Sequence, residues 1–388
     1  MGSFLQIPYR ESRHGIWGEQ TSTLNWCEEV RFRVNLFRER SLPSIRSMLH
    51  CALSASWRVP GAVAASGTVQ VLAQLPVPCG TAPLSNRDYN ITYYCAEFVN
   101  SITNLMFIWL GIRGIRDCIR FRHRPVFVVA CIGYIVVGLG SIAFHTTLKC
   151  GCKISLPPSR LHCLFDCFFV TSYAHPPDSM QLADELPMIY ATCIIGHATF
   201  SYGKSPTVSK LIGLGLFSLG LLITVVYHVT KEPVFHQVSF ACLTIAVVFR
   251  SMYDMEKTLR PALKIRSPER ESGLMRQMWK MCLSGIALFL VGFFIWNMDN
   301  IFCLYLRSWR DILLLPWAVV LEGHAWWHIL TGLAYYFIMW RLWLHTCLDG
   351  KEDEFALQWK TALTSIPRVV PVSDIEPSDA AYKGRRLD

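Results

Sequence analysis

Long apolar segments recur along this chain, and they constrain its fold more than any other feature of the sequence. A helix needs about 20 apolar residues to cross a lipid bilayer. Seven candidate spans of this kind are present, at 98–117, 125–144, 181–201, 210–228, 233–252, 275–296 and 317–345. Only 17% of the residues are charged, whereas a soluble globular protein has about a quarter. The sequence therefore predicts an all-α polytopic membrane protein, folded as a seven-transmembrane helix bundle.

Basic residues are concentrated in the connections on one side of this predicted bundle. One group lies between the first and second spans, from Arg113 to Arg124, and another between the fifth and sixth, from Arg250 to Arg276. Because basic loops remain on the cytoplasmic side, we expect a luminal N-terminus and a cytoplasmic C-terminus, in an endoplasmic reticulum or Golgi membrane. The net charge of +9 is spread over these loops, so no nucleic-acid partner is expected. No obligate protein partner is evident.

A pair of histidines, His324 and His328, stands near the start of the last predicted span. Residues at i and i+4 share one face of a helix, so two imidazoles at this spacing can bind one metal ion. Ionisable groups within a membrane span are usually functional. The alternative is a pair of histidines that only form hydrogen bonds inside the bundle.

The predicted topology brings three more polar residues to the depth of this pair. The second span ends at His145, with Ser141 one turn earlier on the same face, and Asp184 lies at the start of the third span. Three histidines with an open position are the ligand set of a hydrolytic zinc site. A zinc-activated water would attack a polarised carbonyl, and Asp184 would be the general acid and base. Ser141 would hydrogen-bond the water or a developing oxyanion.

Each of these residues also has a structural interpretation. His145 could bond a carbonyl at a helix end, and Asp184 could cap the third helix, where negative charge is favourable. Their convergence at one depth, together with the histidine pair, favours a metal site.

Seven stretches of the chain carry a family resemblance. They are GIWGEQTSTLNWCEE (15–29), AEFVNSITNLMFI (96–108), GLGSIAFHTTLK (138–149), MQLADELPMIY (180–190), EPVFHQ (232–237), WNMDNIFC (296–303) and HAWWHILTG (324–332). Together they resemble the alkaline ceramidases, seven-span zinc hydrolases that act on linear amide C–N bonds, and most resemble the fungal enzymes for phytoceramide and dihydroceramide. The resemblance implies a ceramide lipid substrate, hydrolysed within the membrane to a sphingoid base and a free fatty acid.

The resemblance also assigns roles to residues. It places Zn²⁺ on His145, His324 and His328, and catalysis on Asp184 and Ser141. It implies a Ca²⁺ site formed by Asn25, Trp26 (through its carbonyl), Glu28, Asp88 and Glu97. It also implies a disulfide between Cys27 and Cys303. The first calcium position is usually Asp in the family and the fourth usually Asn. This exchange keeps three carboxylates and one amide, a set of oxygen ligands that suits calcium.

Two segments interrupt the resemblance, at 30–87 and at 150–178. The first splits the calcium motif, and the second separates His145 from Asp184. We interpret both as unspliced introns carried into the sequence; the alternative is a pair of genuine luminal insertions, whose entropic cost would be modest. The predicted division of the chain is 1–29 (luminal segment with the start of the calcium motif), 30–87 (insert), 88–149 (end of that motif and two spans), 150–178 (insert), 179–346 (five spans) and 347–388 (flexible cytoplasmic tail).

Two other functions compete with a ceramidase. One is a non-catalytic, lipid-binding receptor of the same seven-span superfamily, and the other is an inactive product of mis-splicing. The stretch from Asp184 to Pro187 and the WCEE motif at 26–29 favour the ceramidase over the receptor.

Overall fold

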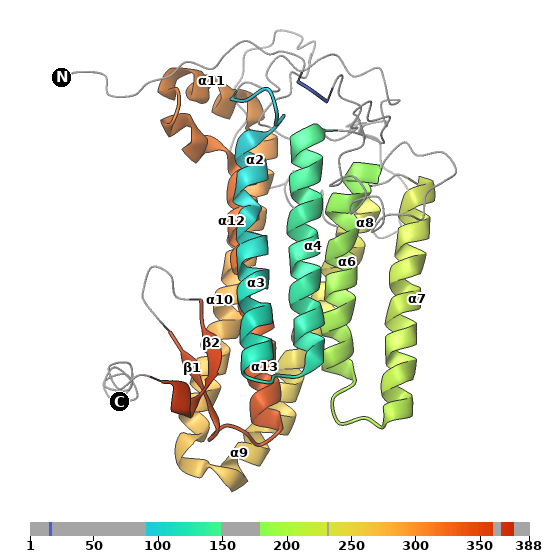
Figure 1. Cartoon of the computed structure of the whole chain (residues 1–388), viewed down its shortest axis with the longest axis vertical. Coiled ribbons are helices and arrows are strands. Elements are labelled where there is room, and N and C mark those ends of the chain that lie inside the picture. Colours follow the sequence, from blue (N-terminus) through green and yellow to red (C-terminus); the bar gives the residue numbers. More distant parts are fainter. Residues whose placement is uncertain (1–14, 18–90, 149–178, 231–232, 360–365, 376–388) are drawn as a thin grey trace, which may run out of the picture.

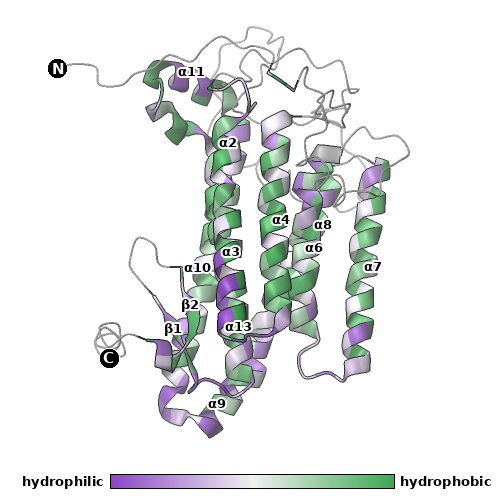
Figure 2. Ribbon diagram, viewed as in Figure 1, coloured by the Kyte–Doolittle hydropathy of each residue, from purple (hydrophilic) through white to green (hydrophobic). Residues whose placement is uncertain are grey.

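The computed structural model describes residues 15–17, 91–148, 179–230, 233–359 and 366–375. Most of these residues form long helices that run side by side along the longest axis of the molecule (Figure 1). Apolar residues dominate the middle of these helices, and hydrophilic residues gather toward their ends (Figure 2). The all-α membrane fold expected from the sequence is confirmed.

Five helices in the described part of the chain are long and apolar enough to cross a membrane. They are Phe98–Arg120 (α2, Phe98–Thr103, followed by α3, Leu105–Arg120), α4 (Pro125–Thr147), α7 (Pro206–Thr230), Val234–Arg266 (α8, Pro233–Tyr253, continued by the π-helix η1, Asp254–Leu259, and α9, Arg260–Arg266) and α10 (Pro268–Ile301). Proline is the first residue of α4, α7, α8 and α10. Its fixed φ suits the first turn, where its missing N–H is not needed.

The third and seventh predicted spans are helical but do not meet the same criterion, so the count of seven spans stays a prediction. The third span is α6 (Ser179–Phe200), which carries Asp184 and Glu185. The seventh is divided into α12 (Gly323–Leu333) and α13 (Tyr336–Leu348). It also starts later than predicted, because residues 317–321 form a short 3-10 helix, η2 (Trp317–Leu321). An additional helix, α11 (Cys303–Leu313), lies at one end of the bundle and was not predicted (Figure 1).

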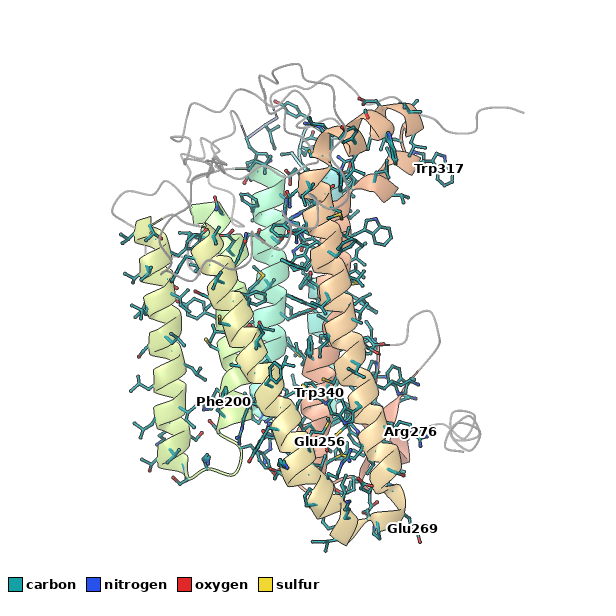
Figure 3. The ribbon with its side chains drawn as sticks, turned by 180° about the vertical axis from the view of Figure 1, so that it is seen from behind. Phe200, Glu256, Glu269, Arg276, Trp317 and Trp340 are labelled. Carbon is teal, nitrogen blue, oxygen red and sulfur yellow. The ribbon has the colours of Figure 1, made fainter. Side chains whose placement is uncertain are left out.

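Tryptophan side chains lie both inside the bundle and at one of its ends. Trp340 of α13 is 1% exposed and belongs to the largest cluster of buried apolar side chains, whereas Trp317 is 59% exposed. In Figure 3, Trp340 lies among the helices, and Trp317 points outward at the end opposite Glu269 and Arg276. Exposed tryptophans at a bundle end are typical of the interface between lipid and water.

Helix α4 packs closely against its neighbours through two glycines. A Cβ at Gly138 would lie 2.8 Å from the Cβ of Phe107 on α3, and one at Gly140 would overlap the backbone carbonyl oxygen of Ala183 on α6. The glycines therefore allow the close helix approach expected of small residues in membrane bundles. The contact at Gly140 sets Ser141 beside the segment of α6 that begins with Asp184.

Within the described part of 347–388, the segment predicted to be a flexible tail, the chain forms two short strands. Strands β1 (Phe355–Gln358) and β2 (Arg368–Pro371) pair antiparallel, with Leu357 opposite Val369. Both of these side chains are buried in the main apolar cluster. Arg368 Nε donates a 2.7 Å hydrogen bond to Asp117 on α3. Apolar burial and this ion pair therefore attach the strand pair to the bundle.

His123, in the loop between α3 and α4, makes a further contact with this strand pair. Its Nε2 lies 3.0 Å from the carbonyl oxygen of Val369. Burial lowers the pKa of His123, and the bond to Val369 partly opposes that effect.

Candidate metal centre

Three histidines meet at one end of the bundle. His145 comes from the last turn of α4, and His324 and His328 come from the first turns of α12. All three are buried, and each offers a ligand atom within 4.8 Å of the other two. The ring centroids are separated by 4.5 Å for His324 and His328, 4.8 Å for His145 and His328, and 5.1 Å for His145 and His324. The structure thus brings together the three residues predicted to bind the metal.

The outer ring nitrogens of two of these histidines are engaged by protein groups. Nδ1 of His145 is hydrogen-bonded to Oε2 of Glu97, which precedes α2. Nδ1 of His328 lies 3.1 Å from the carbonyl oxygen of Asn100 and 3.2 Å from Oγ1 of Thr103. When Nδ1 carries the proton for such a bond, the Nε2 lone pair remains for a metal. Consistent with this, Nε2 of His145 is buried and has no hydrogen-bond partner among the described residues.

Backbone pairing explains why Glu97 reaches His145. The Glu97 N–H donates a 2.9 Å bond to the His145 carbonyl, and the Ala96 N–H donates a 3.0 Å bond to the Thr146 carbonyl. The segment before α2 therefore runs against the last turn of α4. The sequence placed Glu97 in a calcium site, and its contact with a predicted zinc ligand was missed.

A buried ion cluster holds the start of α12. Arg310 of α11 lies 3.3 Å from Asp299 of α10 and 3.1 Å from Glu322, and it also donates a 2.9 Å bond to the carbonyl of Leu321. Asp299 in turn accepts a 3.3 Å bond from the backbone N–H of Gly323, the first residue of α12. The cluster thereby sets the position of His324, which follows directly. The sequence signal for this cluster is the WNMDNIFC stretch (296–303), which places the acidic residue Asp299 at the end of an apolar span.

Asp184 and Ser141 face each other across the contact between α4 and α6. The Ser141 hydroxyl donates a hydrogen bond to the Asp184 carboxylate, and Asp184 is close enough to His145 to interact with it electrostatically. Ser141 and His145 are both buried. The predicted base is therefore next to the histidine cluster, and the predicted serine contacts it directly.

The neighbouring residue, Glu185, belongs to a separate polar network that the sequence reasoning did not identify. The Tyr227 hydroxyl of α7 donates to Oε2 of Glu185, and Nε2 of Gln181 donates a 3.0 Å bond to the Tyr227 oxygen. Nε2 of His236 on α8 lies 3.0 Å from the Glu185 carbonyl oxygen. This network connects α6 with α7 and α8 beside the site.

Several predicted residues lie outside the part of the chain that the structure describes. Among them are Cys27 and four of the five calcium positions, namely Asn25, Trp26, Glu28 and Asp88. The inserts 30–87 and 150–178 also fall outside it. Cys303 is disulfide-bonded, but its pairing with Cys27 stays a prediction.

Comparison with known proteins gives a consistent picture. A family model described as Ceramidase matches residues 85–370. Alkaline ceramidase 3 of Mus musculus is 30% identical over 325 residues, covering 84% of this chain and 84% of the mouse protein. Alkaline ceramidase YPC1 of Saccharomyces cerevisiae is 26% identical over 351 residues, covering 87% and 80% respectively. An alkaline ceramidase of Arabidopsis thaliana is 21% identical over 249 residues, covering 64% and 77%.

Proposed function

This chain belongs to the ceramidase family, and we propose that it hydrolyses the amide bond of ceramide to a sphingoid base and a free fatty acid. Phytoceramide and dihydroceramide are the substrates that we propose. The observation that carries the proposal is the buried cluster of His145, His324 and His328 next to Asp184.

We propose zinc as the metal held by the three histidines. Three buried imidazoles form a donor set that suits this ion, and the buried, unpartnered Nε2 of His145 is a ligand atom in need of a partner. When bound, zinc polarises the substrate carbonyl and activates a water molecule. Glu97 and Asn100 orient the rings of His145 and His328 through Nδ1.

The remaining steps are assigned to Asp184 and Ser141. Asp184 takes the proton of the attacking water and delivers it to the leaving amine, because an amine leaves only when protonated. The hydrogen bond from Ser141 holds the Asp184 carboxylate toward the histidines. The site is enclosed by helices of a multi-pass membrane protein, which suits a lipid substrate.

A paired measurement of bound metal and product tests this function. The purified full-length chain should contain about one zinc per molecule and release sphingoid base from phytoceramide. His324→Ala should lose both properties. His197→Gln, at the end of α6 away from Asp184, should keep both. Zinc binding without any release of sphingoid base would instead favour the lipid-binding receptor. Full turnover by His324→Ala would exclude the metal site.

We also propose a calcium site and a disulfide beside this centre. Oε1 of Glu97 is buried and has no hydrogen-bond partner among the described residues, so it is available to a cation shared with Asn25, the Trp26 carbonyl, Glu28 and Asp88. Cys303, which is disulfide-bonded, would pair with Cys27. Peptide mapping without reduction tests the pairing, and calcium-dependent thermal stability tests the cation site.

We also propose that the two inserts, 30–87 and 150–178, are unspliced introns. The family match starts at residue 85, close to the end of the first insert. Sequencing of the transcript decides this point, since mature messages that contain both segments would rule it out. Fluorescent tagging of each terminus would test the proposed luminal N-terminus, the cytoplasmic C-terminus and the location in the endoplasmic reticulum or Golgi membrane.

A further inference from the structure

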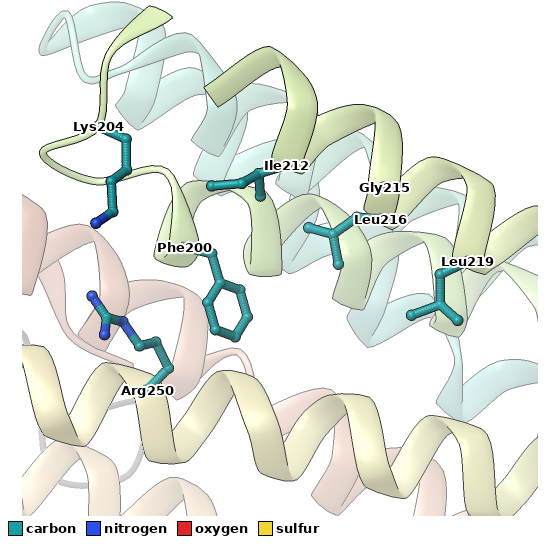
Figure 4. Close-up of a pocket in the computed structure, with 7 residues that line it drawn as sticks. All are labelled: Phe200, Lys204, Ile212, Gly215, Leu216, Leu219 and Arg250. Atoms are coloured by element: carbon teal, nitrogen blue, oxygen red, sulfur yellow. The ribbon is translucent and has the colours of Figure 1, made fainter. Parts of the chain in front are cut away.

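A cavity of about 400 Å³ lies between α6, α7 and α8, and its basic end is at the end of the bundle remote from the start of α12 (Figure 1). Its lining combines two basic side chains with an apolar wall: Lys204 and Arg250, and Phe200, Ile212, Gly215, Leu216 and Leu219. Figure 4 shows Lys204 and Arg250 at one end of the cavity and the aliphatic side chains along the gap between α7 and α8. Its volume is in the range of about 300–1,000 Å³ that is usual for small-ligand sites, but the cavity is largely open along its length.

The charges around the basic end do not balance. Asp254 is the acceptor for both Arg250, at 3.0 Å, and Arg341, at 3.4 Å. Lys204 also acts on Asp254 electrostatically. One carboxylate therefore serves three cations. In addition, Nε of Arg250 is buried without a hydrogen-bond partner among the described residues, so the guanidinium that lines the cavity has an unused donor.

The apolar end of the cavity is open to lipid. Helix α7 exposes Leu211, Leu214 and Leu222 along its length, and an added Cβ at Gly215 would meet no atom within 4 Å. The space over Gly215 can therefore hold a hydrocarbon chain. A cationic pocket between helices at the membrane surface, continued by an apolar groove, has the chemistry that recognises an anionic lipid.

We propose that this cavity binds one anionic phospholipid from the adjoining leaflet. Its phosphate lies between Lys204 and Arg250, and one acyl chain lies between α7 and α8 against Ile212, Leu216 and Leu219. This site is independent of ceramide hydrolysis, because ceramide is uncharged and needs neither cation. The basic connections at 113–124 and 250–276 lie at the same end of the bundle, so the lipid would come from the leaflet predicted to be cytoplasmic.

Native mass spectrometry of the full-length protein in detergent tests the proposal. The probes are dioleoyl phosphatidylserine and dioleoyl phosphatidylcholine, which share acyl chains and differ in net charge. We expect one retained phosphatidylserine and much weaker retention of phosphatidylcholine. Lys204→Gln should weaken phosphatidylserine binding about fivefold, since one cation near anionic lipid contributes about 1 kcal/mol. Gly215→Phe should abolish retention by filling the groove.

Two matched controls separate this site from general surface effects. Lys210→Gln removes one charge from α7 outside the cavity lining, and Leu214→Phe adds an aromatic ring on an exposed position of the same helix. Both should bind phosphatidylserine like the wild type.

Equal losses in Lys204→Gln and Lys210→Gln would overturn the proposal, as would equal retention of the two phospholipids. Displacement of phosphatidylserine by stoichiometric oleate would assign the cavity to a fatty acid instead. Lys204→Gln and Gly215→Phe leave the Arg250–Asp254 pair intact, so the test does not depend on the folding of an Arg250 variant.

Discussion

Oε2 of Glu97 is hydrogen-bonded to Nδ1 of His145, and both side chains are completely buried. A carboxylate behind a metal-binding histidine fixes the orientation of the ring and makes it a stronger ligand. Glu97 therefore acts on the centre without belonging to the histidine cluster.

Replacement of Glu97 by Gln should weaken zinc binding. The amide keeps the size of the side chain but loses the negative charge that supports His145, and such changes typically cost about 10–100-fold in metal affinity or activity. Competition with a chromogenic chelator would measure the affinity. Glu269→Gln, an exposed carboxylate at the other end of the bundle, is the matched control. Unchanged metal affinity in Glu97→Gln would contradict a supporting role.

Replacement of Arg310 by Met should destabilise the protein and disturb α12. Arg310 is 2% exposed, and its loss would remove the cation that bridges the buried carboxylates of Asp299 and Glu322. Breaking a buried ion pair in this way costs about 3–5 kcal/mol. The midpoint of thermal unfolding in detergent should fall, and zinc content should fall with it. Arg276→Met removes an exposed guanidinium of α10 and should change stability by no more than about 0.5 kcal/mol.

Replacement of Gly140 by Ala should separate α4 from α6. The added methyl group would overlap the backbone of Ala183, and overpacking of this kind costs about 1–3 kcal/mol. Because Ser141 and Asp184 adjoin these two residues, the rate of ceramide hydrolysis should fall even under conditions where the variant remains folded. Gly133→Ala, whose new Cβ would lie 3.5 Å from that of Ala191 on the same helix pair, should be tolerated. Equal activity in the two variants would refute this explanation.

Acidification should loosen the attachment of the strand pair β1–β2. Burial holds the pKa of His123 below its ordinary value of 6.5, so the detached form binds a proton more readily than the attached form. The attachment is therefore fully stable above that ordinary value and weakens as the pH falls below it. The hydrogen-exchange protection factors of residues 366–371, which correct for the slower intrinsic exchange at lower pH, should fall between about pH 7 and about pH 5. His123→Gln should lose this dependence, whereas persistence of the full pH effect in that variant would assign it to another group.

Much of this architecture could be predicted because its causes are local. Apolar runs located the helices, and the i,i+4 spacing singled out His324 and His328 as candidate metal ligands. The strand pair was missed because Leu357 and Val369 lie in short segments with little periodicity. They are buried only because the bundle offers an apolar surface to them. Sequence position likewise gave no indication that Arg310 would reach Asp299, since that contact depends on how α11 folds back over α10.

The three histidines of the proposed metal centre come from helices that are made at different times during synthesis. Translation completes α4, with His145, well before Gly323 opens α12. A nascent chain that stops before that glycine has one imidazole of the three, too few for a stable zinc site. Loading of the proposed zinc would therefore belong to the final stage of membrane insertion, and prematurely terminated chains should leave the ribosome as metal-free proteins.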